Sequence, residues 1–167
     1  NAAAARTFLS CARSGLHDPF AMHDMDRAVG VIRGAIERGE RIVVYGDYDV
    51  DGITSTTLLV SILRLFGLNP SYFVPRRMEE GYGLSEAALE RALASGNPDL
   101  LIALDCGTNA GEAVNYIRSR GIDLIVVDHH QAKDATDQSH ILINPHVFDF
   151  EGAPWRQLCT VGLVFKL

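Results

Sequence analysis

The hydrophobic residues of this chain follow two patterns that alternate along its length. Short apolar runs rich in β-branched residues alternate with longer stretches in which an apolar residue recurs every three or four positions. The runs are typical of strands buried on both faces of a parallel sheet, and the periodic stretches are typical of amphipathic helices. Strands are expected over residues 41–46, 71–74, 100–104, 123–127 and 140–143. Because helical stretches separate most of these runs, the pattern predicts an α/β fold, with a parallel doubly wound sheet and helices on both faces.

Helix start and stop signals bound the periodic stretches. Asp24 is a candidate N-cap for the first stretch, and a glycine follows most of the stretches where a helix should end. Helices are expected over residues 24–39, 54–66, 85–94 and 110–119. Residues 1–23 show little periodicity, whereas residues 163–167 read as part of an apolar helix. We expect one domain over residues 1–167, truncated at its C-terminus, with residues 1–39 forming a segment and a helix that pack on it.

Composition narrows the class of protein. The chain has 167 residues, of which 47% are hydrophobic, so it can bury one sizeable core. Its 15 basic and 21 acidic side chains give a net charge of −6, which argues against a protein that coats phosphate backbones generally, so any nucleic-acid binding must be local. The 3 cysteines include no CxxC pair, no signal peptide is recognisable, and no apolar run approaches about 18 residues. We therefore expect a cytoplasmic protein with no membrane partner.

Acidic and imidazole side chains follow three of the expected strands. They are Asp47, Asp49 and Asp51 after the first strand, Asp105 after the third, and Asp128, His129 and His130 after the fourth. Ligand sites of open parallel sheets lie beyond the carboxyl ends of the strands, so we expect these side chains to meet at one edge. Such a cluster of acids is repulsive unless cations neutralise it. Carboxylates with imidazoles suit Mn²⁺ or Mg²⁺, so the pattern predicts a two-metal site that hydrolyses phosphoesters or phosphoanhydrides.

Two other known motifs overlap with this pattern. Residues 47–52 imitate the start of an EF-hand loop, but Leu58 stands where that loop needs a bidentate Glu, and a strand precedes the segment. Residues 49–54 imitate the nucleophile loop of haloacid-dehalogenase-type phosphatases, whose pattern does not explain residues 128–130. We therefore reject a calcium site and rank the phosphatase loop below the two-metal site.

Two further segments are candidates for contact with a phosphate or a base. Residues 54–57 offer hydroxyls and helix N-terminal amides, although an ordinary capped helix start explains them equally well. Arg76, Arg77 and Tyr82 lie in a loop after the second strand, where they can clamp a phosphate and stack on a base; a solvated loop is an equal alternative. The sequence contains no Gly-x-Gly-x-x-Gly or phosphate-loop motif, so neither dinucleotide binding nor ATP hydrolysis is expected.

The sequence resembles the DHH phosphoesterase superfamily and, in detail, its RecJ branch of single-strand-specific 5′→3′ DNA exonucleases. The resemblance covers nearly the whole chain and includes the segments 16–20, 46–52, 77–84, 105–107, 128–130, 143–145 and 162–167. The Asp-His-His motif indicates the superfamily, and the flanking segments favour the RecJ branch. The resemblance implies a hydrolase that degrades single-stranded DNA to 5′-mononucleotides in repair and recombination, with a single-strand-binding protein or a helicase as a partner.

The resemblance also assigns roles to residues of this chain. The ligands of Mn²⁺ or Mg²⁺ would be Asp49, Asp51, Asp105 and His129, with Asp105 bridging two ions. Asp128 and His130 would orient a ligand or contact the scissile phosphate, and Asp47 would lie behind the ligands. The strand contacts would be Arg76 or Arg77 and Tyr82. Because Tyr45 stands where relatives often have a metal-binding His, and a further family Asp falls after Leu167, we expect partial metal occupancy and little nuclease activity.

Two other functions stay open at this point. A DHH enzyme for small substrates would turn over oligoribonucleotides, cyclic dinucleotides or pyrophosphate faster than long DNA. A non-catalytic relative that binds nucleic acid or acts as a scaffold would keep the fold without binding Mn²⁺. The intact acidic positions argue against the non-catalytic relative.

Overall fold

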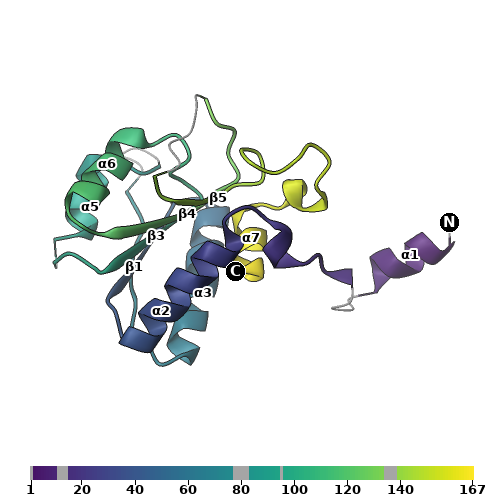
Figure 1. The fold of residues 1–167 in the computed structure, drawn as a ribbon, viewed down its shortest axis with the longest axis horizontal. Coiled ribbons are helices and arrows are strands. Elements are labelled where there is room, and N and C mark those ends of the chain that lie inside the picture. The colour runs from purple at the N-terminus through teal and green to yellow at the C-terminus, as the bar shows by residue number, and fades with distance from the viewer. Residues whose placement is uncertain (1, 11–14, 77–82, 95, 134–138) are drawn as a thin grey trace.

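A five-stranded sheet forms the centre of the computed structural model, which describes residues 2–10, 15–76, 83–94, 96–133 and 139–167 (Figure 1). Its strands are β1 (Ile42–Gly46), β2 (Ser71–Phe73), β3 (Leu100–Leu104), β4 (Asp123–Val127) and β5 (Ile141–Ile143). They lie in the order β2-β1-β3-β4-β5, and every neighbouring pair is parallel. The predicted parallel sheet is confirmed, and β3 and β4 have the predicted bounds.

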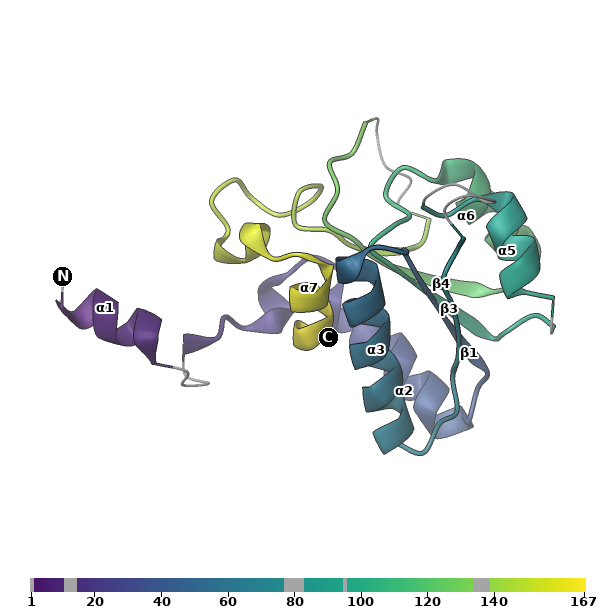
Figure 2. The same cartoon turned by 180° about the vertical axis from the view of Figure 1, so that it is seen from behind.

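Helices cover both faces of this sheet (Figures 1 and 2). One face carries α2 (Met25–Arg38), α3 (Val50–Leu65) and α7 (Thr160–Lys166), and the other carries α5 (Glu86–Ala92) and α6 (Gly111–Ser119). Along β3, Leu100 and Ile102 pack toward α2 and α3, whereas Leu101 packs toward α5 and α6. Because both faces are buried, the strand is apolar without interruption. The doubly wound arrangement is confirmed.

Helix α3 begins earlier than its sequence suggests. The prediction placed its start at Thr54, but the helix starts at Val50, because the Asp49 carboxylate accepts a hydrogen bond from the Gly52 amide at 3.0 Å and caps the first turn. The hydroxyls of Thr54 and Thr57 donate to carbonyls of the preceding helical turn, at 2.6 Å and 2.8 Å. The interpretation of residues 54–57 as an exposed helix N-terminus is therefore wrong.

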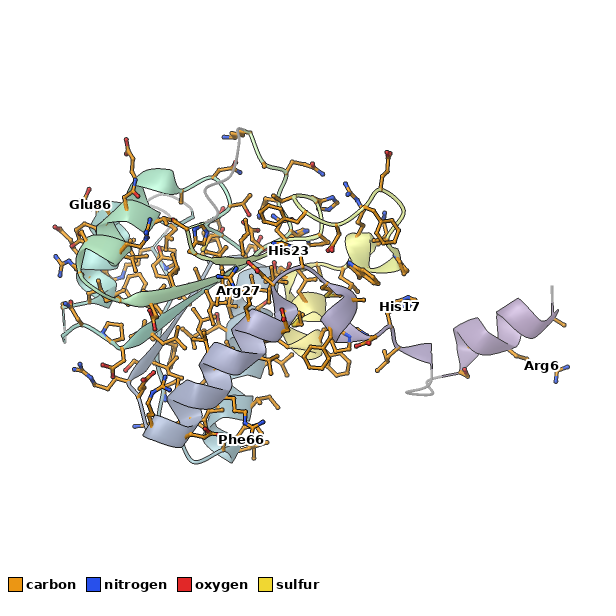
Figure 3. The ribbon with its side chains drawn as sticks, viewed as in Figure 1. Arg6, His17, His23, Arg27, Phe66 and Glu86 are labelled. Carbon is orange, nitrogen blue, oxygen red and sulfur yellow. The ribbon has the colours of Figure 1, made fainter. Side chains whose placement is uncertain are left out.

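Asp24 precedes α2 as predicted, but its carboxylate does not cap the helix. The residue has a left-handed φ of 59°, and its side chain makes no capping hydrogen bond. Its carboxylate instead accepts from the Leu142 amide of β5 at 3.1 Å and pairs with Arg27 at 2.7 Å. Figure 3 shows Arg27 and His23 near this end of α2. Asp24 therefore ties α2 to the edge of the sheet.

Among the described residues, three short elements were not predicted. They are α1 (Ala2–Leu9) and the 3₁₀ turns η2 (Pro19–Ala21) and η3 (Pro154–Gln157). Helix α1 lies apart from the sheet in both views (Figures 1 and 2). Within the described residues, none of the helices combines the length and the hydrophobicity needed to cross a lipid bilayer.

The strand order reverses between β1 and β3. After β1 the chain adds β2 on one side and then returns to add β3 on the other, so two loops diverge at the carboxyl ends of these neighbouring strands. A crevice at such a switch point is the usual ligand site of an open α/β sheet. Here the loop after β1 is residues 47–49, and the loop after β3 starts at Asp105.

Glycine at position 52 lets α3 pass close to the loop after β1. A Cβ at Gly52 would lie 2.3 Å from the Asp47 carbonyl oxygen. We expect Gly52→Ala to lower the free energy of unfolding by about 2–3 kcal/mol, because backbone must move to relieve the clash. Urea unfolding monitored by circular dichroism measures this, with Gly111→Ala as the control, because a Cβ there meets no heavy atom within 4 Å. Equal midpoints for the two variants would contradict the close approach.

Candidate metal centre

The ends of β1, β3 and β4 bring the predicted acids and imidazoles together. One possible ligand atom from each of Asp105, His129 and His130 lies within 4.8 Å of the others. His129 Nε2 lies 3.4 Å from Asp105 Oδ1 and 3.6 Å from Asp51 Oδ2. Asp49 lies near enough to Asp105 for each carboxyl group to shift the pKa of the other. The structure thus gathers the four residues that the sequence nominated as metal ligands; their role as ligands stays a prediction.

Asp105 is the most constrained of these acids. Its side chain is buried, and its φ of 64° lies in the left-handed region that residues other than glycine rarely adopt. Burial, with the nearby Asp51 and Asp49 carboxylates, raises the pKa of Asp105 to about 8. The Gly52 amide and the Asp105 carboxyl group lower the pKa of Asp49. A proton on Asp105 therefore offsets part of the repulsion that a cation would otherwise relieve.

Asp128 holds the loop that carries both histidines. Its buried carboxylate accepts hydrogen bonds from the amides of Thr108, His129 and His130, at 3.1, 2.7 and 3.2 Å. The same carboxylate lies 2.7 Å from His130 Nδ1. Burial alone would raise the pKa of Asp128, but the hydrogen bonds from His130 and Thr108 outweigh it and lower the pKa to about 2. The partner His130 has its pKa raised to about 9 by the Asp128 carboxylate. The geometry agrees with an orienting role for Asp128.

The other nominated residues differ in how much the structure says of them. Asp47 is half-buried, and its carboxylate accepts from the Tyr48 amide at 2.7 Å. Arg76 is exposed just after β2, whereas Arg77 and Tyr82 lie outside the described residues. The roles of these four residues stay predictions.

Tyr45 is buried between the sheet and α5. Its ring stacks on Phe73 at 5.4 Å between centroids, and its hydroxyl donates to the Gly83 carbonyl at 2.9 Å. The position that the resemblance linked to a metal-binding His is thus part of the hydrophobic layer in this chain.

The sequence did not indicate that Thr160 belongs to the centre. Thr160, the first residue of α7, donates its hydroxyl to Asp105 Oδ1 at 2.9 Å and its amide to Asp51 Oδ2 at 2.7 Å. No local pattern around Thr160 points to these bonds, because both acids are distant in sequence. The glycine two residues later and the apolar run that follows it predict only a helix.

The donor set fits a hard or borderline divalent cation. The Asp51 and Asp105 carboxylates converge on His129, with His130 and Asp49 beside them. Oxygen ligands with a minority of imidazole nitrogens suit Mn²⁺ and Mg²⁺. The buried Asp105 and the neighbouring, more exposed Asp51 and Asp49 also supply the negative charge that such an ion balances.

The sequence matches a known protein family and two curated proteins. Residues 41–167 match the model of the DHH family, N-terminal domain. The chain is 40% identical over 144 residues to the single-stranded-DNA-specific exonuclease RecJ of Salmonella typhimurium, covering 86% of this chain and 25% of that protein. It is 33% identical over 168 residues to the RecJ of Bacillus subtilis, covering 99% of this chain and 21% of that protein.

A solved structure shows the same fold. A crystal structure of exonuclease RecJ bound to manganese superposes with a TM-score of 0.75 at 30% identity, covering 86% of this chain and 36% of that chain. The present chain spans 25% and 21% of the length of the two RecJ proteins reported above.

Proposed function

Because the chain belongs to the DHH family, we propose that it is the metal-binding catalytic part of a single-stranded-DNA-specific exonuclease. The observation that carries the proposal is the convergence of Asp51 and Asp105 on His129 Nε2. The two relatives named RecJ support the choice of single-stranded DNA over small nucleotides as the substrate. The reaction would be hydrolysis of a phosphodiester bond with release of 5′-mononucleotides in the 5′→3′ direction, and the compartment would be the cytoplasm.

The acids and His129 of the centre would be the ligands of the metal ion. Asp49, Asp51, Asp105 and His129 would hold Mn²⁺ or Mg²⁺. A bound ion of this kind lowers the pKa of a coordinated water and stabilises negative charge on a phosphoryl oxygen. The buried Asp105 would have to lose its proton to bind a cation, so cation binding would be coupled to proton release.

His130 supplies the positive charge of the site. With a pKa raised to about 9 it is protonated at neutral pH, and its Nδ1 is occupied by Asp128. Its Nε2–H is left to donate to a phosphate oxygen, which a DNA strand carries at every step. Asp128 thereby keeps the imidazole both charged and oriented.

Residues outside the centre would bind the rest of the DNA strand. Arg76, with Arg77 and Tyr82, would bind a phosphate and stack on a base beyond the centre. With a net charge of −6, the chain as a whole does not attract DNA, so the strand must be recognised locally. A single-strand-binding protein or a helicase would deliver the strand.

Nuclease assays with end-labelled DNA test the proposal. Because this chain spans only 25% and 21% of its two RecJ relatives, we expect Mn²⁺-dependent degradation in the whole protein. A 3′-labelled single strand should yield short labelled products only at late times, whereas a 5′ label should be released at once as mononucleotide. Duplex DNA serves as the matched substrate control, and EDTA should abolish the activity. Asp123→Asn, at the amino end of β4 and away from the centre, should retain it.

Other outcomes would contradict the proposal in distinct ways. Faster turnover of oligoribonucleotides, cyclic dinucleotides or pyrophosphate would point to a DHH enzyme for small substrates. Absence of Mn²⁺ binding in calorimetry would point to a non-catalytic relative.

A further inference from the structure

The two carboxylate oxygens that face His129 are held by a single residue. Asp51 Oδ2 and Asp105 Oδ1 lie 3.6 Å and 3.4 Å from His129 Nε2. The Thr160 amide donates to the first of these oxygens at 2.7 Å, and the Thr160 hydroxyl donates to the second at 2.9 Å. The donors of Thr160 therefore act on the same two atoms that would bind a cation beside His129.

Thr160 is placed to impose this geometry rather than to follow it. Its side chain is fully buried at the start of α7. The next amide, that of Val161, donates to Asp51 Oδ1 at 2.9 Å, so the Asp51 carboxylate is held by two backbone donors. Helix α7 packs in the same hydrophobic layer as α3, through Leu163 and Val164. The donors are thus fixed by the core and not by the acids.

Hydrogen bonds of this kind orient a carboxylate without occupying it. A carboxylate oxygen has lone pairs for more than one partner, so an oxygen that accepts from Thr160 can still bind a cation. Donors that orient the ligands of a metal raise its affinity, because the ligands need not be reordered on binding. They also reduce the repulsion between two acids that the fold forces together.

We propose that Thr160 is a positioning residue that presets Asp51 and Asp105 for metal binding, an inference that rests on the proposed metal-dependent function. Only one of its two contacts depends on the side chain. Thr160→Val keeps the branched shape and the amide donor but removes the hydroxyl bond to Asp105, whereas Thr160→Ser keeps the hydroxyl.

Direct measurement of Mn²⁺ binding tests this role. Electron paramagnetic resonance of free Mn²⁺, titrated with the protein in the absence of DNA, gives the dissociation constant. We expect Thr160→Val to weaken binding by about 10–100-fold, the range found when groups behind metal ligands are removed. Thr160→Ser should stay close to wild type. Thr57→Val, on the exposed face of α3, is the matched control and should have no effect.

The outcomes separate this inference from a structural role and from the proposed function. Thermal unfolding without metal shows whether each variant folds; if Thr160→Val does not, Thr160→Ser and Thr160→Ala carry the same comparison, because they differ by one hydroxyl. Equal Mn²⁺ affinity with and without the hydroxyl would overturn the inference. If wild type binds Mn²⁺ but leaves single-stranded DNA intact, the proposed function fails while the comparison of affinities still decides the role of Thr160.

Discussion

Replacement of Asp105 by asparagine should abolish Mn²⁺-dependent cleavage and yet make the metal-free protein more stable at pH 8 and above. In the whole protein the loss of activity should be roughly 10³-fold or more, as expected when a group central to catalysis is removed. The gain in stability follows from the environment of Asp105, which is buried beside Asp51 and Asp49. An amide fills the same space without a charge, so it does not add to this repulsion.

The pH dependence of stability gives this prediction a definite sign. The pKa of Asp105 is about 8 in the folded chain, against an ordinary value of 3.8. Between these values the folded state holds a proton that the unfolded state has lost, so the contribution of Asp105 makes stability fall as the pH rises from about 4 to 8. The Asp105→Asn variant should lack this contribution. Thermal unfolding at pH 5, 7 and 9 should therefore show the gap between the two proteins widening by several degrees.

Addition of Mn²⁺ should reverse the order of the two proteins. A cation that binds only the folded state raises the melting temperature, and it should do so for wild type at pH 8 but not for Asp105→Asn. Asp26→Asn, in the exposed first turn of α2, is the control and should follow wild type in every condition. A melting temperature of Asp105→Asn below that of wild type without metal at pH 9 would contradict the account of Asp105 as a strained acid.

Replacement of Asp128 by asparagine should lower the free energy of unfolding more than Gly52→Ala does. The buried carboxylate accepts three amide hydrogen bonds and pairs with His130. In the variant, the asparagine NH2 group would replace one accepting oxygen and would face N–H donors. We expect a loss of about 3–5 kcal/mol in the free energy of unfolding, typical of leaving a buried charged network without one partner. Urea unfolding at pH 5 measures this directly.

The Asp128–His130 pair also predicts where this loss is greatest. The pKa of Asp128 is lowered from 3.8 to about 2, so its contribution is present above pH 3.8 and disappears as the pH falls toward 2. The pKa of His130 is raised from 6.5 to about 9, so its contribution is complete below pH 6.5 and disappears as the pH rises through 9. The pair should thus stabilise the fold most between pH 3.8 and 6.5.

A double-mutant cycle separates the pair from the amide bonds. Asp128→Asn, His130→Asn and the double variant, measured at pH 5 and pH 10, give the coupling between the two side chains. The coupling should be present at pH 5 and largely absent at pH 10, while the amide contribution of Asp128 persists at both. A coupling that does not change with pH would mean that the imidazole does not bind the carboxylate as a cation.

Much of the fold could be predicted because its signals are local. The bounds of β3 and β4 follow from apolar runs that are buried on both faces, so each run ends where the strand leaves the core. The start of α3 was misplaced because Asp49 was interpreted as a candidate metal ligand only, although it also caps the helix. The carboxylate of Asp24 was assigned to its own helix, but it bonds across to β5, and such a contact is set by tertiary packing.

The candidate site was predictable to a similar extent. Asp51, Asp105 and His129 were nominated because acidic and imidazole residues at the ends of parallel strands must meet at one edge. The left-handed backbone of Asp105 and the donors of Thr160 have no such signal, since each depends on atoms supplied by distant parts of the chain.

The span of these distant contacts bears on how the chain folds. Thr160 reaches Asp105 across 55 residues and Asp51 across 109 residues. Contacts that close such long loops are costly in entropy and tend to form late, after local helices and neighbouring strands have assembled. Partly folded forms would present the acids singly and dispersed, with little hold on a cation. The ion should therefore leave the folding rate nearly unchanged and slow unfolding, because it binds only after the chain has folded.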